Sequence, residues 1–292
     1  MAASGLPERP HSAVHPAERP HIRRAGRNLW AAIAVGLLMG AGILVALFTV
    51  RQVFIGIVAA AVAVSSCELA GALRRTDVRV SLPPVLLGGQ AMVWLAWPLG
   101  RDGILVAFVI TALVCLVWRF PRGAAGYVRD VSASVFSTAY VAGLAAFATL
   151  LVVPADGAAR VLCLMLAGVA SDIGGYATGV LGGRHLMAPS ISPKKSWEGF
   201  IGSLVVGTAA GALSVTFLLG GQPWRGVVFG AAIVLTATGG DLVESLIKRD
   251  LGVKDMGTVL PGHGGLMDRI DSLLPSAVVS WLLLSLLVPV GG

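Results

Sequence analysis

Long apolar stretches recur along nearly the whole 292-residue chain, and this pattern limits what the chain can fold into. A run of about 20 apolar residues is long enough for one helix to cross the hydrocarbon core of a bilayer. Apolar residues make up 56% of the chain and charged residues only 13%, whereas soluble domains carry about 25% charge. The composition therefore excludes an ordinary soluble fold and predicts a polytopic integral membrane protein.

Nine apolar runs are candidates for transmembrane helices. They lack the alternation of barrel strands, and a backbone in lipid must satisfy its hydrogen bonds within its own segment. The predicted fold class is therefore all-α, a helical bundle of about nine transmembrane helices. The runs are Leu29–Phe48, Val53–Leu73, Leu82–Leu99, Ile104–Trp118, Val131–Val153, Val161–Leu181, Phe200–Gly220, Gly226–Ile247 and Ser272–Val288.

Basic residues are distributed unevenly between the loops, and Lys- and Arg-rich loops stay in the cytoplasm. With the N-terminus inside, 18 of the 22 basic residues lie in inner segments. The other four, Arg51, Arg101, Arg160 and Arg225, fall one to each outer loop. We therefore predict a multi-pass membrane protein with a cytoplasmic N-terminus, and we expect it in the bacterial plasma (inner) membrane. The net charge of +7 then requires no nucleic-acid partner.

Three regions follow from the distribution of polar segments. Residues 1–28 are predicted to form a disordered basic cytoplasmic tail, because they are polar, rich in proline and without an apolar period. Residues 29–153 hold the N-terminal transmembrane helices, and residues 154–292 form a transmembrane region that we expect to be catalytic. The two long inner loops, 182–199 and 248–271, lie in this region, and function is expected there.

Four carboxylates lie inside the apolar runs, where an ionisable group is costly and suggests function. They are Glu68, Asp172, Asp241 and Glu244. Glu68 is expected to pair with Arg74 or Arg75 near the end of its run. Asp172 lies beside a stripe of small residues at four-residue spacing, which predicts close helix packing but does not account for a carboxylate. The stripe consists of Ala167, Ser171, Gly175, Gly179 and Gly183.

The first long inner loop contains two adjacent lysines, Lys194 and Lys195, flanked by the hydroxyls of Ser192 and Ser196. Lysines next to hydroxyl donors suit a polyphosphate ligand. Ordinary cytoplasmic positive charge would also account for the lysines, though not for the hydroxyls. Both interpretations remain open from the loop alone.

The eighth run ends with a carboxylate, a hydroxyl and an ammonium group on one helix face. Asp241, Ser245 and Lys248 lie at positions i, i+4 and i+7, and Glu244 lies beside Ser245. The loop that follows is rich in glycine around a histidine, so that backbone N–H groups can approach an anion. Its last part reads Pro261-Gly262-His263-Gly264-Gly265-Leu266-Met267-Asp268-Arg269-Ile270-Asp271.

Asp268 and Asp271 are three residues apart at the start of the ninth run, so they share a face. Helix capping would account for Asp271 but not for Asp268. Clustered carboxylates favour Mg²⁺ over softer metals. Magnesium, lysines and backbone amides together are typical of phosphoryl or nucleotidyl transfer. The residues alone therefore predict a magnesium-dependent enzyme that acts on polyphosphates at the cytoplasmic surface.

The stretch from Ser245 to Asp271 resembles the signature of phosphatidate cytidylyltransferases, also called CDP-diacylglycerol synthases. Its matching positions are Ser245, Lys248, Arg249, Lys254, Asp255, Pro261, His263, Gly264, Gly265, Asp268, Arg269 and Asp271. The pair Ser171-Asp172 and the segment Ser192–Gly199 also fit this family, so the likeness covers roughly residues 165–275. The N-terminal half is similar only as a set of apolar runs.

The resemblance implies that CTP and phosphatidate, a membrane lipid, give CDP-diacylglycerol and pyrophosphate. It implies a Mg²⁺ ion at Asp241, Asp268 and Ser245, and it leaves open a second, monovalent cation and a homodimer. The catalytic residues it implies are Asp241, Asp268, Asp271, Lys248 and Arg249. The substrate-binding residues it implies are Asp172, Ser192, Lys194, Lys195, Ser196, Lys254, His263, Gly264, Gly265 and Arg269.

Two other functions fit part of the sequence. A CTP-dependent kinase of a lipid alcohol would use the same ion and nucleotide but would release CDP. A membrane transporter would place its charged residues near the bilayer midplane between broken helices, whereas most of the polar residues here lie at the inner helix ends and in two loops.

Overall fold

The structure is a computed structural model that describes residues 40–259 and 264–289. The predicted tail 1–28, most of the run Leu29–Phe48 and the loop residues 260–263 lie outside the described residues. A short apolar helix, Gly40–Thr49, precedes the labelled elements. These are α2 (Arg51–Arg74), α3 (Leu82–Trp118), η1 (Phe120–Arg122), α4 (Tyr127–Ser137), η2 (Thr138–Gly143), α5 (Leu144–Val152), α6 (Gly157–Gly182), β1 (Leu186–Ala188), β2 (Ser192–Ser196), α7 (Trp197–Leu219), α8 (Pro223–Asp250), α9 (Met267–Ile270) and α10 (Leu273–Leu287).

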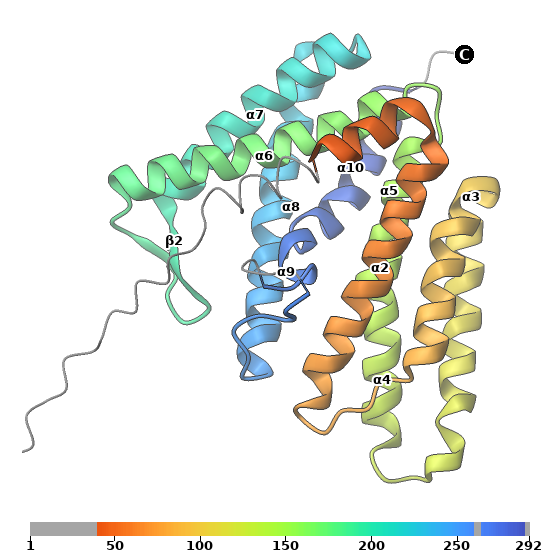
Figure 1. Cartoon of the computed structure of the whole chain (residues 1–292). Coiled ribbons are helices and arrows are strands. Elements are labelled where there is room, and N and C mark those ends of the chain that lie inside the picture. The colour runs from red at the N-terminus through yellow and green to blue at the C-terminus, as the bar shows by residue number, and fades with distance from the viewer. Residues whose placement is uncertain (1–39, 260–263, 290–292) are drawn as a thin grey trace, which may run out of the picture.

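The described residues form an almost wholly helical bundle (Figure 1). Among them, seven helices are long and apolar enough to cross a membrane, and α4, η2 and α5 together make one of the seven. The all-α polytopic membrane fold is therefore confirmed. The count of nine is not confirmed. Two of the predicted runs lie in the single helix α3, and a third lies mostly outside the described residues.

The first difference lies in α3, which contains two of the predicted runs. The helix is interrupted at Gly100, whose backbone has φ 60° and ψ −139°, a conformation that favours glycine. The chain turns back there, and the two halves of α3 run side by side (Figure 1). Gly88 of the first half lies against Thr111 of the second half, too close for a Cβ atom. The second difference is the first predicted run, which is mostly outside the described residues.

The side chains of the four arginines in the predicted outer loops each contact another helix or the turn next to it. Arg51 donates to carbonyls in the turn just after α5. Arg160 and Arg225 donate to the carbonyls of Val288 and Leu287, at the C-terminal end of α10. The Arg101 guanidinium lies 5.7 Å from the centre of the Trp281 ring. The orientation of the bundle in the membrane stays a prediction.

Helices α6 and α7 pack closely, as the stripe of small residues predicted. A Cβ atom at Gly174 would come within 2.6 Å of the Gly202 carbonyl oxygen. One at Gly179 would lie 3.7 Å from the Gly199 Cα. Small residues therefore let two backbones come into contact, and the stripe has the role that sequence assigned to it.

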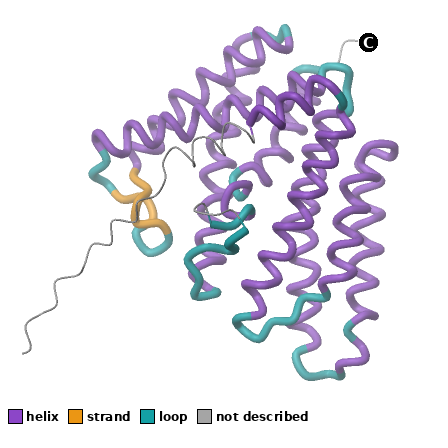
Figure 2. The backbone as a smooth tube through the Cα atoms, viewed as in Figure 1, coloured by secondary structure: helices purple, strands orange, loops and turns teal. Residues whose placement is uncertain are grey.

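The first long inner loop is not wholly irregular, because part of it forms a two-stranded antiparallel hairpin (Figure 2). Leu186 pairs with Ser196, and Ala188 pairs with Ser192. The Ser196 hydroxyl accepts a hydrogen bond from the Gly199 N–H at 3.1 Å and caps α7. Glu198 also binds His185 Nδ1 at 2.6 Å. The hairpin is thus fastened to α7 at its base, and β2 contains both lysines of the loop.

A buried ion pair stabilises the end of the bundle where α3 meets α4. Asp130, only 1% exposed, lies 2.9 Å from the Nε of Arg119, which is 4% exposed. Its other carboxylate oxygen accepts from the Arg79 N–H at 3.0 Å. Replacement of Asp130 by Ala leaves Arg119 buried without a counter-charge, so we expect a loss of about 3–5 kcal/mol in the free energy of unfolding.

Denaturant titration in detergent micelles would measure this loss. The matched control is Asp250→Ala, since Asp250 is exposed at the end of α8. That variant should stay within about 0.5 kcal/mol of the unaltered protein. Equal stability of the two variants would mean that the Arg119 pair contributes nothing.

Candidate active site

A cavity of about 500 Å³ opens where α6, the hairpin, α7, α8 and the segment around α9 meet. The structure thus brings together residues from both long inner loops and from helices α6 and α8. The predicted site residues that line it are Asp172, Lys194, Lys195, Ser196, Asp241, Asp268, Arg269 and Asp271. Its lining contains both acidic groups and the lysines of β2.

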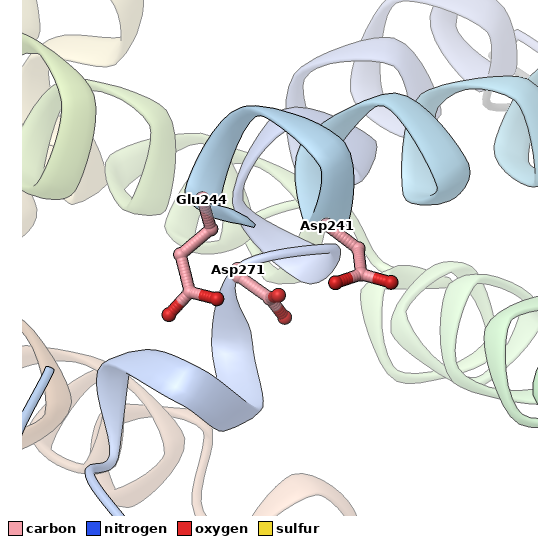
Figure 3. A group of neighbouring side chains, drawn as sticks. All are labelled: Asp241, Glu244 and Asp271. Atoms are coloured by element: carbon pink, nitrogen blue, oxygen red, sulfur yellow. The ribbon is translucent and has the colours of Figure 1, made fainter. Parts of the chain in front are cut away.

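Three carboxylates lie close to one another (Figure 3), and two of them, Asp241 and Asp271, line the cavity. Asp241 and Glu244 project from α8, and Asp271 projects from the turn between α9 and α10. One oxygen of each lies within 4.8 Å of the others, close enough for one metal ion to bind all three. Glu244 is fully buried and Asp271 is 7% exposed. Hard oxygen ligands of this kind fit a Mg²⁺ ion better than a soft metal.

Asp268 has other partners and does not belong to this group of three. Its carboxylate accepts hydrogen bonds from the backbone N–H groups of Met256, at 3.0 Å, and Gly265, at 2.9 Å. It also lies 3.0 Å from Lys248 Nζ. Lys248 in turn contacts the buried Glu244 one helical turn earlier on α8. Asp268 therefore fastens the loop to α8, although it also lines the cavity.

The predicted metal set, Asp241, Asp268 and Ser245, stays a prediction. Asp241 belongs to the observed cluster, where Glu244 and Asp271 lie beside it. Ser245 follows Glu244 on α8 and is not among the described residues that line the cavity. Asp271 also accepts a hydrogen bond from the Ser272 N–H at 2.7 Å, at the start of α10. This contact with the adjacent residue is not a helix cap, since α10 has no side-chain cap hydrogen bond.

The lysines of β2 differ in their surroundings. Lys195 Nζ lies 2.6 Å from a carboxylate oxygen of Asp241 and 3.3 Å from the Thr238 carbonyl. Lys194 is exposed and lines the cavity. Asp172, also exposed, faces the cavity from α6. The hairpin thus brings positive charge directly to Asp241 of α8.

The other predicted residues are not among the described residues that line the cavity. Arg249 Nε donates to the Ile191 carbonyl at 3.3 Å and so connects α8 to the hairpin. Gly265 is bound to Asp268, and Gly264 has a φ of +84° that favours glycine. Ser192 and Lys254 are not among the described residues that line the cavity. His263 lies outside the described residues.

Comparison with known proteins gives the family. A cytidylyltransferase family model matches residues 30–287. The chain belongs to the cytidylyltransferase family. A phosphatidate cytidylyltransferase of Mycobacterium leprae is 51% identical over 280 residues, which is 90% of each chain. One of Mycobacterium bovis is 47% identical over 300 residues, 98% of each chain. One of Mycobacterium tuberculosis (strain H37Rv) is 47% identical and covers 98% of this chain and 92% of the relative.

In this cytidylyltransferase, the sequence interpretation of Glu68 needs correction. No ion pair between Glu68 and Arg74 or Arg75 occurs in the part of the chain that the structure describes. The Glu68 carboxylate instead accepts two backbone N–H groups of the second long loop, from Leu266 and Met267. Its position inside an apolar run was the signal that it has a special role, but that signal did not name its partner.

Proposed function

We propose that this cytidylyltransferase transfers a cytidylyl group from CTP to phosphatidate. The products are CDP-diacylglycerol, a precursor of phospholipids, and pyrophosphate. We further propose that the reaction needs Mg²⁺ and takes place at the cytoplasmic face of the bacterial plasma membrane. The observation that carries this proposal is the cavity in which the lysines of β2 face the carboxylates of α8 and α9–α10. The names of the relatives at 47–51% identity support the choice of substrate.

The bond changes are simple. An oxygen of the phosphatidate phosphate attacks the α-phosphorus of CTP, and the bond from this phosphorus to the β-phosphate oxygen breaks. The leaving group is pyrophosphate. A phosphate monoester is already largely ionised near neutral pH, because its second pKa is about 6. The attacking oxygen therefore requires no strong base, and His263 has no necessary role as one.

The cavity residues bind and orient the two substrates. In our proposal Lys194 and Lys195 hold phosphate oxygens of CTP from the hairpin side. Asp241, with Glu244 and Asp271, would hold Mg²⁺, and Asp268 keeps the loop against α8. A bound Mg²⁺ neutralises the triphosphate and the pyrophosphate that leaves. The acyl chains of phosphatidate remain in the bilayer while its headgroup reaches the cavity, since the protein is a multi-pass membrane protein.

The proposal is tested by turnover of CTP with purified protein in phosphatidate-containing micelles. Pyrophosphate and CDP are followed separately, with Mg²⁺ and with EDTA. We expect pyrophosphate release that depends on phosphatidate and stops with EDTA. Release of CDP with a lipid alcohol would instead indicate a kinase. Solute flux through liposomes without any CTP turnover would indicate a transporter.

Replacement of Lys195 by Gln should lower kcat/KM for CTP by about tenfold to a hundredfold. The reason is that a hydrogen bond to a charged group contributes about 1.5–3 kcal/mol. Initial rates over a range of CTP concentrations measure the change. Arg184→Gln is the matched control, because Arg184 is exposed at the base of the hairpin and is not among the residues that line the cavity. An equal decrease in both variants would show only the effect of net charge.

A further inference from the structure

Glu68 joins the N-terminal half of the bundle to the loop of the candidate site. It lies near the end of α2 and is only 7% exposed. Its Oε1 accepts the Leu266 N–H at 3.0 Å, and its Oε2 accepts the Met267 N–H at 2.8 Å. A buried carboxylate with both oxygens engaged by backbone donors holds those donors firmly.

Two glycines leave room for this carboxylate. A Cβ atom at Gly257 would collide with the Glu68 carboxylate, and all three of its nearest atoms belong to Glu68. A Cβ atom at Gly265 would lie 2.8 Å from Glu68 Oε2 and 2.9 Å from Asp268 Oδ2. Glu68 therefore lies against the loop at both Gly257 and Gly265, and a larger residue does not fit at either position.

The donors that Glu68 holds precede the acidic residues of the cavity. Leu266 and Met267 begin the short helix α9, which carries Asp268 and leads to Asp271. Helix α9 has only four residues, and a helix this short does not persist without external contacts. Asp268 connects two parts of the loop, because its carboxylate accepts the N–H groups of Met256 and Gly265. Glu68, from α2, binds the same loop at the next two N–H groups, those of Leu266 and Met267.

We propose that Glu68 is a positioning residue for the transfer reaction. It holds the backbone at 265–267 so that Asp268 and Asp271 keep their places at the cavity. This inference rests on the proposed function, and it gives the N-terminal half a part in the reaction besides membrane anchoring. Glu68 itself is not among the residues that line the cavity, so it acts through the loop and does not touch the substrates.

The test compares two variants that disturb the same contact from opposite sides. Glu68→Gln keeps the shape of the side chain but only one acceptor oxygen. Gly257→Ala keeps Glu68 and places a methyl group against its carboxylate. We expect both to lower kcat about tenfold to a hundredfold, since small misplacements of reacting groups cost this much. The Mg²⁺ concentration for half-maximal rate should rise, while KM for CTP changes less than about threefold.

Gln90→Leu is the matched control. The Gln90 side-chain amide donates to the Ala59 carbonyl at 2.9 Å and so joins α3 to α2 without contacting the loop. Its kcat and Mg²⁺ dependence should stay within about twofold of the unaltered protein. The double variant Glu68→Ala with Gly257→Ala adds a second readout. Its loss in kcat should be smaller than the product of the losses measured for Glu68→Ala alone and Gly257→Ala alone, because the methyl group then meets no carboxylate.

Two results would overturn the inference. One is an unchanged kcat and Mg²⁺ dependence in folded Glu68→Gln or, if that variant does not fold, in Gly257→Ala. The other is an equal loss in Gln90→Leu, which would indicate a general weakening of the bundle. Failure of the unaltered protein to form CDP-diacylglycerol would contradict the proposed function, so the two failures are distinguishable.

Discussion

Replacement of Asp241 by Asn should lower the rate of CDP-diacylglycerol formation by a factor of about 10³, the cost of removing a key electrostatic group from a reaction centre. Asp241 is the residue shared by the predicted metal set and the observed carboxylate cluster. It also lies 2.6 Å from Lys195. The amide keeps the size of the side chain but removes its charge, so binding of Mg²⁺ should weaken most. Initial rates over a Mg²⁺ titration measure both effects.

Asp250→Asn is the control for this experiment. It makes the same chemical change on the same helix, at an exposed position that does not line the cavity. We expect its rate to stay within about twofold of the unaltered protein. A rate for Asp241→Asn above a tenth of the original would remove Asp241 from the proposed metal site.

Replacement of Asp268 by Asn should abolish turnover while the protein still inserts into the membrane. Asp268 accepts hydrogen bonds from Met256 and Gly265 and pairs with Lys248. The amide would leave Lys248 with one anionic partner where it has two. In either orientation its NH₂ group would face a donor, the Lys248 ammonium or the backbone N–H groups. The loop should then lose its attachment to α8. We expect a decrease in rate of at least about 10²-fold to 10³-fold.

Membrane fractionation and the thermal midpoint in detergent show whether the Asp268 variant is inserted and folded. Asp102→Asn provides the comparison, because Asp102 is exposed next to the turn of α3. Retained activity in Asp268→Asn would mean that neither the loop contact nor the charge is required. An inactive and unfolded Asp268 variant would place the residue in folding instead of in the reaction.

The sequence predicts the helical membrane fold because apolar runs and small-residue stripes are local patterns. The close packing of α6 on α7 followed directly from residues four apart, of which Gly175 and Gly179 are examples. The separation of the two halves of α3 also followed from a local signal, since the charged pair Arg101-Asp102 interrupts the apolar run. The number of crossings depends on how such interruptions are counted, so it could not be fixed in the same way.

The site was predictable only in part, and for a physical reason. Asp241 and Lys248 share a helix face, so helix geometry alone placed both near the loop. The metal role of Asp268 stays a prediction. Its contacts with backbone donors could not be predicted, because they belong to a loop without periodic structure. The hairpin that carries Lys195 has no apolar alternation in β2, so the sequence indicated only a polar loop.

The buried position of Glu68 has a consequence for the order of events during synthesis. Its hydrogen-bond donors are 198 and 199 residues further along the chain. The ribosome therefore completes most of the bundle before these donors exist. Until then the Glu68 carboxylate of α2 lacks these hydrogen-bond donors, which is unfavourable inside the membrane. The loop is therefore made late, just before α10, and the reaction centre forms only when nearly the whole chain has been made. A nascent chain that stops before residue 266 should remain a target for membrane proteases, while a chain that reaches α10 should become resistant.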